Sequence, residues 1–329
     1  MPRLLVALLL LLLAGPSLAQ VSDGLAEAYV ETTHLDEAIA SIAEQFTAQI
    51  GMQAGQLPEP AREPFVEIYG AALSPDALAE RLETYVAEAG DADSIRAVLA
   101  WYEQPLAQEM QAIERAADDD DQAQVALQMY AMTGAFTDYT PSPERQAQMD
   151  RYLEVSGSTG AFVDLYTDVI VASAGSMQEI SGEEPPPADS IRAVVRPQLE
   201  NQIVNSLRGG LLYTYRKVED DTFDAYLDLL DEPAARYTNR LGPAAMSAAL
   251  VGALTDAGEA FSQRLMELDA AGEIDLDAMR AEMEQRAAQQ RQMQQSQGME
   301  DGEPMDDEPT MEDDEPTMED DGMEMEDDG

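Results

Sequence analysis

Two stretches of the sequence share one pattern: Trp101–Met110 reads WYEQPLAQEM, and Leu229–Thr238, 128 residues later, reads LLDEPAARYT. In each, an aromatic or leucine pair precedes an acidic or amide dipeptide, and a proline then opens a second apolar run. Ahead of each proline, apolar residues recur at i, i+3, i+4 and i+7, a spacing that lines one face of a helix and not of a strand. These are Ile95, Val98, Leu99 and Tyr102 before Pro105, and Phe223, Tyr226, Leu227 and Leu230 before Pro233.

The prolines predict where each helix breaks. Proline lacks the N–H that a helix interior needs, but it is well tolerated in a first turn. Each copy is therefore predicted to be a helix, a break at the proline and a second helix. Ser94 and Thr222 stand at matching positions ahead of the apolar runs and are the predicted N-caps, with Asp93 and Asp221 as alternatives.

A second register competes with this one. Ala92–Val98 (ADSIRAV) is identical to Ala188–Val194, at an offset of 96 residues. In that register Pro105 aligns with Asn201 and the apolar pattern drifts. The offset of 128 is preferred because it keeps the helix starts, the apolar stripe and the proline together.

The whole pattern predicts an all-α fold made of two diverged helical repeats built on proline-kinked helical hairpins. The predicted parts are a first repeat over 20–140, a second over 141–270, an exposed helix over 271–298 and a disordered acidic tail over 299–329. The helices expected include a long one over Ala28–Ile50, one starting at Ser74, one over Ser190–Val218 with a kink or close contact at Gly209-Gly210, one over Pro243–Leu254, and a last one around Phe261 and Leu265.

The first residues predict export. Arg3 precedes the apolar run Leu4–Ala14, and Ser17-Leu18-Ala19 offers a small-x-small cleavage site, so residues 1–19 are expected to be a signal peptide cut after Ala19. A membrane anchor is the alternative, but the run is shorter than the roughly 20 residues that a spanning helix needs. A periplasmic or secreted protein without stable membrane insertion is expected.

The charge excludes some partners. Acidic residues number 66 against 18 basic ones, for a net charge of −48, and Lys217 is the single lysine. The tail holds 17 of the acids, so the rest of the chain is acidic too. Nucleic acid is excluded because phosphate binding needs a basic face. An acidic, lysine-poor chain is what a salt-adapted, halophilic organism favours, since salt screens the self-repulsion.

No catalytic or cofactor site stands out. There is no cysteine, and His34 is the single histidine, so a His-based triad or a zinc site has no second ligand of those types. The four acids Asp118–Asp121 lack a calcium-loop frame and are interpreted as a solvated turn. In the tail, Met323-Glu324-Met325 offers thioethers for copper(I) or carboxylates for weak binding of divalent cations, although a solubilising role is the simpler interpretation.

The hairpin kinks are the predicted interaction positions: Trp101, Tyr102, Pro105, Leu230 and Pro233. Helix ends leave free backbone groups there, so the aromatic pair can line a ligand groove. The competing interpretation is that the aromatic side chains belong to the core.

The hairpin resembles the helical module of a bacterial exported family known as domain of unknown function 2059, in which a capped helix runs into an aromatic-Tyr-x-Ser-Pro-x-Gly step. Trp101–Ala107 occupies that step in the first copy and Leu229–Ala235 in the second, and Tyr215–Lys217 is similar to what precedes it. Gln104 and Glu232 replace the serine, and alanine replaces the glycine. The resemblance implies an exported helical protein and supplies no activity.

Three functions remain open from the sequence. The first is a non-catalytic binding module for an unknown protein or envelope component. The second is an envelope hydrolase that uses an Asp/Glu pair between the copies. The third is a protein that binds divalent cations through the acidic tail.

Overall fold

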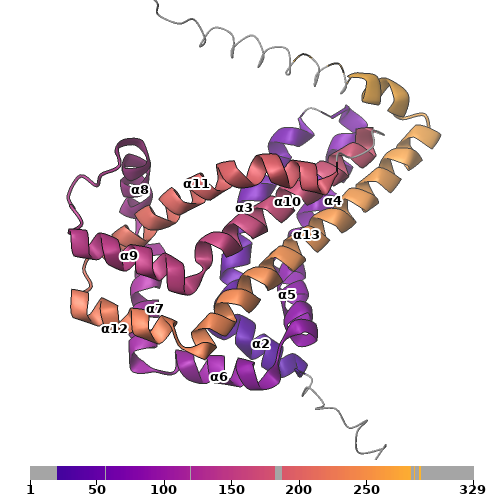
Figure 1. The fold of residues 1–329 in the computed structure, drawn as a ribbon. Helices are drawn as coiled ribbons and strands as arrows, with labels where there is room; N and C mark the ends of the chain where they lie inside the picture. Colours follow the sequence, from indigo (N-terminus) through magenta and orange to yellow (C-terminus); the bar gives the residue numbers. More distant parts are fainter. Residues whose placement is uncertain are drawn as a thin grey trace, which may run out of the picture. The chain divides into compact units, whose positions relative to one another are not determined.

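The computed structural model describes residues 21–55, 57–118, 120–181 and 187–282, together with 285 and 289. Every regular element in these ranges is a helix, which confirms the all-α class (Figure 1). The predicted signal peptide and acidic tail lie outside the described residues. The helices are α2 (Asp23–Thr32), α3 (Leu35–Ala54), α4 (Glu59–Ala72), α5 (Pro75–Ala89), α6 (Ala92–Tyr102), α7 (Pro105–Asp118), α8 (Asp121–Thr133), α9 (Pro143–Ser156), α10 (Ser158–Ser181), α11 (Ala188–Thr214), α12 (Asp220–Leu230) and α13 (Pro233–Ala270).

The breaks at the two prolines lie where the sequence places them. Two residues separate the end of α6 from Pro105, which begins α7, and two separate the end of α12 from Pro233, which begins α13. Helices α6 and α12 have the same length, 11 residues. The helices after the prolines differ, because α7 has 14 residues and α13 has 38. The division into two related repeats stays a prediction.

The predicted caps of α6 and α12 are wrong. The N-cap of α6 is Asp91, whose carboxylate accepts a hydrogen bond of 2.8 Å from the backbone N–H of Ser94. The N-cap of α12 is Glu219, three residues before Thr222. Both helices begin one turn earlier than the apolar stripe suggests. Asp91 supplies a side-chain acceptor for the first N–H groups of α6, whereas Glu219 makes no side-chain cap hydrogen bond at α12.

The long helix expected over Ala28–Ile50 is two helices. His34 separates α2 from α3 with a left-handed backbone, at a φ of +53°. The Thr33 hydroxyl donates to the Tyr29 carbonyl at 2.7 Å and helps to end α2. Because of this break, the apolar faces of both helices can be buried, and Tyr29 on α2 and Ile39 on α3 are fully covered.

The helices expected at Pro243–Leu254 and around Phe261 are one continuous element, α13. Pro243 removes one backbone hydrogen bond inside it. Buried residues on both sides of the proline, Leu241 and Ala245 among them, hold the helix together across it. At Gly242 a Cβ would lie 3.2 Å from a methyl carbon of Leu35, so a larger residue there would crowd α3.

Gly209-Gly210 marks a close helix contact and not a kink. Helix α11 continues through both glycines, and a Cβ at Gly209 would lie 2.7 Å from a ring carbon of Tyr130 on α8. A residue with a side chain would therefore force α8 away from α11.

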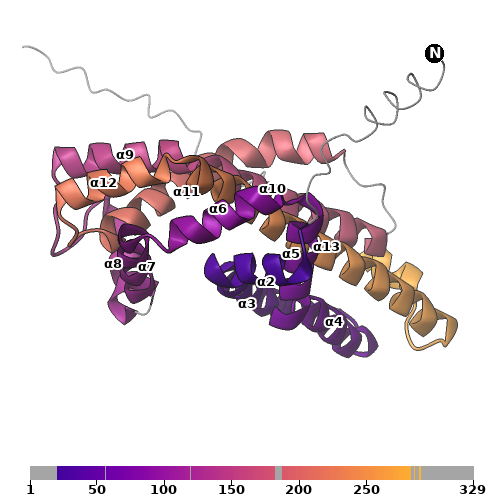
Figure 2. The same cartoon turned by 90° about the horizontal axis from the view of Figure 1, so that it is seen from below.

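Helix α13 packs against elements on both sides of the loop that separates the two predicted repeats. It contacts α4, α5 and α6 from the first and α10 from the second, as the views in Figures 1 and 2 show. Helices α9 and α12 lie side by side and share an ion pair between a buried arginine and a half-exposed aspartate. The Arg145 side chain is 6% exposed, lies 2.6 Å from the Asp220 carboxylate and stacks over Phe223, 5.0 Å from the ring centre. The described residues up to Ala281 form one compact unit.

Candidate functional site

A cavity of about 850 Å³ lies between the two predicted repeats. Its wall is rich in aromatic rings, and these rings come from both sides of the interface. The first repeat contributes side chains from α3, α6, α7 and α8, and the second from α9 to α13. The aromatic residues that line the cavity are Trp101, Tyr102, Tyr152, Phe162, Tyr166, Tyr213 and Tyr226.

Three of the five predicted interaction positions line this cavity. Trp101 and Tyr102 at the end of α6 and Leu230 at the end of α12 belong to its wall. Pro105 and Pro233 are exposed first-turn residues of α7 and α13 and are not among the lining residues. The prolines therefore position the wall by ending the helices before them.

Trp101 serves both the core and the cavity wall, so the two interpretations of its role are compatible. Its side chain is 4% exposed, and its ring meets Tyr102 edge to face at 4.9 Å between centroids. The indole N–H donates a hydrogen bond of 3.1 Å to the Leu229 carbonyl. Leu229 is the residue 128 positions later, so this bond joins the matching ends of α6 and α12.

A carboxylate on α7, that of Glu114, organises the phenols of the cavity. The hydroxyl groups of Tyr215 and Tyr226 both donate to its Oε1, with a distance of 3.1 Å from Tyr226. Burial raises the pKa of both phenols well above the ordinary value, and the charge of Glu114 raises it further. The two tyrosines therefore stay protonated and remain hydrogen-bond donors at neutral pH.

Two other phenols at this wall, those of Tyr102 and Tyr152, are also held in the neutral form. Burial raises the pKa of Tyr102 to about 12, and the charge of Glu114 adds to the effect, while a hydrogen bond with Thr238 opposes it. Burial likewise raises the pKa of Tyr152. Tyr29 on α2 reaches the same Thr238, with 2.9 Å between the two hydroxyl oxygens. This part of the cavity wall thus offers neutral aromatic faces around the Glu114 carboxylate.

Further charges lie along the wall. Asp120 accepts hydrogen bonds from the Tyr213 hydroxyl at 2.9 Å and from Arg216 at 3.3 Å, and these contacts lower its pKa. Glu37 lies 3.4 Å from the imidazole of His34, so the single histidine of the chain also borders the cavity. Among the described residues no group of three or more His, Cys, Asp or Glu side chains is placed to hold a metal ion.

One buried donor at the boundary of the cavity has no protein partner. The Nδ2 atom of Asn239 on α13 is shielded from solvent and makes no hydrogen bond within the described part of the chain. Buried polar groups of native proteins nearly always have a hydrogen-bond partner. This amide nitrogen is therefore available to donate to an acceptor from outside the described chain.

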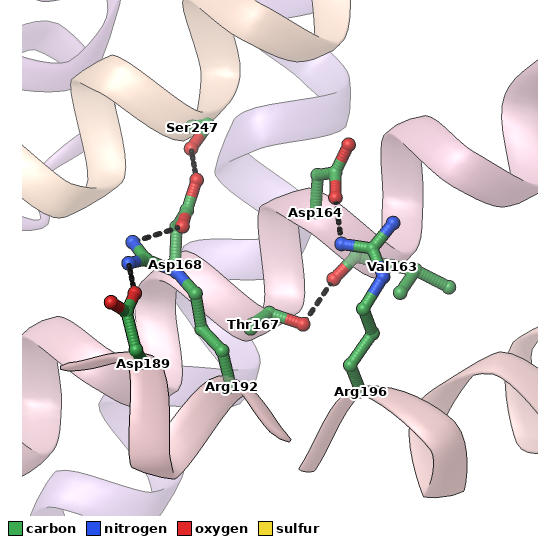
Figure 3. A network of polar contacts seen from close by, with 8 residues as sticks. All are labelled: Val163, Asp164, Thr167, Asp168, Asp189, Arg192, Arg196 and Ser247. Atoms are coloured by element: carbon green, nitrogen blue, oxygen red, sulfur yellow. Dashed lines mark hydrogen bonds and ion pairs between the residues drawn. The ribbon is translucent and has the colours of Figure 1, made fainter. Parts of the chain in front are cut away.

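A larger groove, of about 1000 Å³, follows a different face of α10 and also borders Asn239. Figure 3 shows the charges along it pairing with one another. Asp168 lies 3.1 Å from Arg192 and accepts a bond of 3.3 Å from the Ser247 hydroxyl, and Asp164 pairs with Arg196. These contacts hold α11 and α13 against α10, so the groove is better explained as a helix junction than as a binding site.

The sequence does not single out Glu114 or Tyr213, and it identifies Tyr226 only as part of the apolar stripe ahead of Pro233. With 66 acids in the chain, one carboxylate cannot be told from the others by composition. One usable signal is that Glu114 follows the apolar residues Met110 and Ile113 on α7 at offsets of four and one, at the edge of the buried stripe. Tyr215 is noticed only as part of the Tyr215–Lys217 resemblance.

Comparison with protein-family models, with curated proteins and with solved structures gave no match. The resemblance to domain of unknown function 2059 therefore stays a prediction. None of the described helices has the length and apolar character that crossing a membrane requires.

Proposed function

We propose that this protein is an exported, non-catalytic binding module of the cell envelope, and that the cavity between the two predicted repeats is its binding site. The observation that supports the proposal most directly is that aromatic side chains from both predicted repeats line one cavity. Ligand sites are commonly cavities of roughly 300–1,000 Å³, largely apolar, with a few placed polar groups. The volume of about 850 Å³ and the placement of Glu114 among phenols match that description.

The buried amide of Asn239 supports the same proposal. Its Nδ2 lacks a partner among the described residues, and an acceptor atom on a ligand would satisfy it. Asn239 borders the cavity beside Thr238 and Ala235, on the first three turns of α13.

The hydrolase interpretation gains no support from Asp120 in this wall. A carboxylate pair that divides acid and base roles needs one member with a raised pKa. The pKa of Asp120 is lowered instead. A raised carboxyl pKa occurs at Glu83 on α5, caused by burial and then by the charges of Glu27 and Glu31, but Glu83 does not line the cavity.

Export is the part of this proposal that rests on the sequence. The mass of the mature protein, recovered from the envelope fraction of its own cells, tests it directly. Cleavage after Ala19 predicts a chain that begins at Gln20. Recovery of the uncleaved chain from the cytoplasm would contradict it.

The binding proposal is tested by what co-purifies with the protein. The tagged chain is expressed with its own N-terminal segment, crosslinked in its own cells near native salt, and analysed by native mass spectrometry. The variant Ala38→Trp fills the cavity from an exposed lining position of α3. The matched control Ala48→Trp places the same side chain on an exposed position of α3 that does not line the cavity.

A bound species that survives in the Ala48→Trp variant and falls at least tenfold in Ala38→Trp is the expected result. A bound species that both variants retain equally would place binding elsewhere on the protein. If nothing co-purifies with any variant, the proposal fails.

A further inference from the structure

We infer that the ligand of this cavity is an organic cation, a quaternary ammonium group carried on a small-molecule body. The inference rests on the proposed function, because it names the chemistry of the occupant of that same site. It is drawn from the charge of the wall, the aromatic rings and the hydrogen bonds of Glu114.

The charge of the wall favours a cation. Three carboxylates line the cavity, those of Glu37, Glu114 and Asp120, against the guanidinium of Arg115 and the imidazole of His34. The chain as a whole carries a net charge of −48. A cleft lined by one sign of charge, in a protein of the same sign, concentrates counter-ions and repels anionic ligands.

The rings favour a cation with an apolar surface. Ammonium groups are attracted to the faces of Trp, Tyr and Phe, and cages of such rings recognise quaternary ammonium ligands. The protein already holds one cation in this way at the edge of the cavity. The guanidinium of Arg216 lies 3.6 Å from the centre of the Tyr213 ring and pairs with Asp120.

Glu114 stands among Tyr102, Tyr152 and Tyr226 in the same combination of one carboxylate and several rings. Two phenol hydroxyls already donate to its Oε1. A cation that needs to donate N–H groups would compete with those phenols for this oxygen. A quaternary ammonium group does not compete in this way, because it has no N–H and its attraction comes from charge and from contact with the rings.

Choline and its neutral carbon analogue, 3,3-dimethylbutan-1-ol, are the probes that separate charge from shape. Binding of each to the purified chain is measured by titration calorimetry near native salt. Choline is expected to bind at least tenfold more tightly than the neutral analogue. Glu114→Gln is expected to weaken choline binding about tenfold, which corresponds to about 1.4 kcal/mol, because it removes the charge and leaves the rings in place. The matched control Glu109→Gln lies on an exposed position of α7 outside the cavity and is expected to change nothing.

Because Glu114 accepts two phenol hydrogen bonds, each variant is first compared with the parent by thermal melting. If Glu114→Gln does not fold, the exposed rim residue Glu37 gives the second variant, Glu37→Gln, with an expected weakening of two- to threefold. Vesicles of phosphatidylcholine form a separate arm, because the same headgroup can come from a lipid. Choline binding without vesicle binding identifies a soluble cation, and vesicle binding that Ala38→Trp abolishes identifies a lipid headgroup.

Equal binding of choline and its neutral analogue would overturn the inference, and so would a Glu114→Gln variant that binds choline as tightly as the parent does. A cavity that binds a neutral oligosaccharide or an anion, while it rejects choline, would overturn the inference and leave the proposed function standing. If Ala38→Trp fills the cavity and changes the binding of no species, both this inference and the proposed function fail.

Discussion

The same seven residues, ADSIRAV, begin two helices of this protein and meet two different environments. Ala92–Val98 opens α6, and Ala188–Val194 opens α11. In α6 the stripe is closed from solvent, with Ile95 and Val98 both 0% exposed. In α11 the residue that corresponds to Val98 is Val194, which is 64% exposed.

The difference comes from what lies beside each helix. Helix α6 is covered by α2 and α13, which close over its apolar stripe. The first turns of α11 lie against α10, where Arg192 and Arg196 pair with Asp168 and Asp164 (Figure 3). The sequence of the segment is sufficient to make a helix in both places, while burial is decided by the neighbours. Identity of sequence at an offset of 96 residues therefore does not indicate equivalent positions in the fold.

A charge at the shared valine position gives the largest expected difference in stability between the two helices. Val98→Asp would bury a carboxylate without a partner, so we expect a loss of more than about 4 kcal/mol and a chain that is largely unfolded. Val194→Asp is expected to change stability by no more than about 0.5 kcal/mol. Urea unfolding followed by circular dichroism measures both. Two equally stable variants would show that α6 is not covered in solution.

Truncation of the shared isoleucine tests packing without charge. Ile95→Ala is expected to cost about 2–5 kcal/mol, because it leaves a cavity beside α2 and α13. Ile191 is half-buried, so Ile191→Ala is expected to cost no more than about half as much. The free energies of unfolding from the same urea titrations give the ratio. A ratio near one would mean that both stripes are equally covered.

The caps ahead of the two segments also differ. Asp91 caps α6 through its carboxylate, whereas Pro187 precedes α11 and offers no side-chain acceptor. We expect Asp91→Ala to lower the melting temperature by about 2–4 °C. Asp91→Asn keeps a side-chain acceptor and should lower the melting temperature much less. This comparison separates the loss of the cap hydrogen bond from a general effect of substitution.

The cap has a predictable pH dependence. Hydrogen bonds from the hydroxyl and the backbone N–H of Ser94 lower the pKa of Asp91 below its ordinary value of 3.8. A carboxyl group whose pKa is lower in the folded state stabilises above its unfolded pKa and loses that contribution as pH falls through the folded value. The difference in melting temperature between the parent and Asp91→Asn should therefore persist above about pH 4 and shrink below it. A difference that grows on acidification would contradict the assigned cap.

Removal of the shared arginine gives the smallest expected difference in stability between the two helices. Arg192 pairs with Asp168 on another helix, and Arg96 pairs with Asp93 in its own helix at a more exposed site. Arg192→Ala is expected to cost about 0.5 kcal/mol and Arg96→Ala less than about 0.3 kcal/mol. Both costs should vanish in 1 M salt, where screening acts within about 3 Å. Unfolding at low and high salt checks this, and a cost that salt leaves unchanged would mean that packing is the cause.

The sequence predicts the helices of this protein better than their ends. The all-α class, the breaks before Pro105 and Pro233, and the cap at Ser74 follow from periodicity and from proline chemistry. The break at His34 does not follow, because a left-handed residue is selected by the packing of the helices on both sides of it. The continuity of α13 through Pro243 does not follow either, because buried neighbours outweigh one missing hydrogen bond.

The residues of the candidate site also fall into those that the sequence predicts and those that it does not. Trp101, Tyr102 and Leu230 can be predicted because they end an amphipathic stripe, and helix ends commonly border cavities. Glu114 and Tyr226 cannot be predicted, since their contact joins residues 112 positions apart. No local pattern of residues contains that information; it comes only from the way α7 and α12 meet.

The position of α13 in the chain has a consequence for how the protein is made. At 38 residues it extends over roughly 57 Å, and its buried face completes the cores of α4, α5 and α10. It is also the last of these helices to leave the ribosome. A growing chain therefore carries open cores until residue 270 has been synthesised, and neither half can reach its final packing early. The final packing of α4, α5 and α10 must therefore follow the synthesis of α13 and cannot be reached before it.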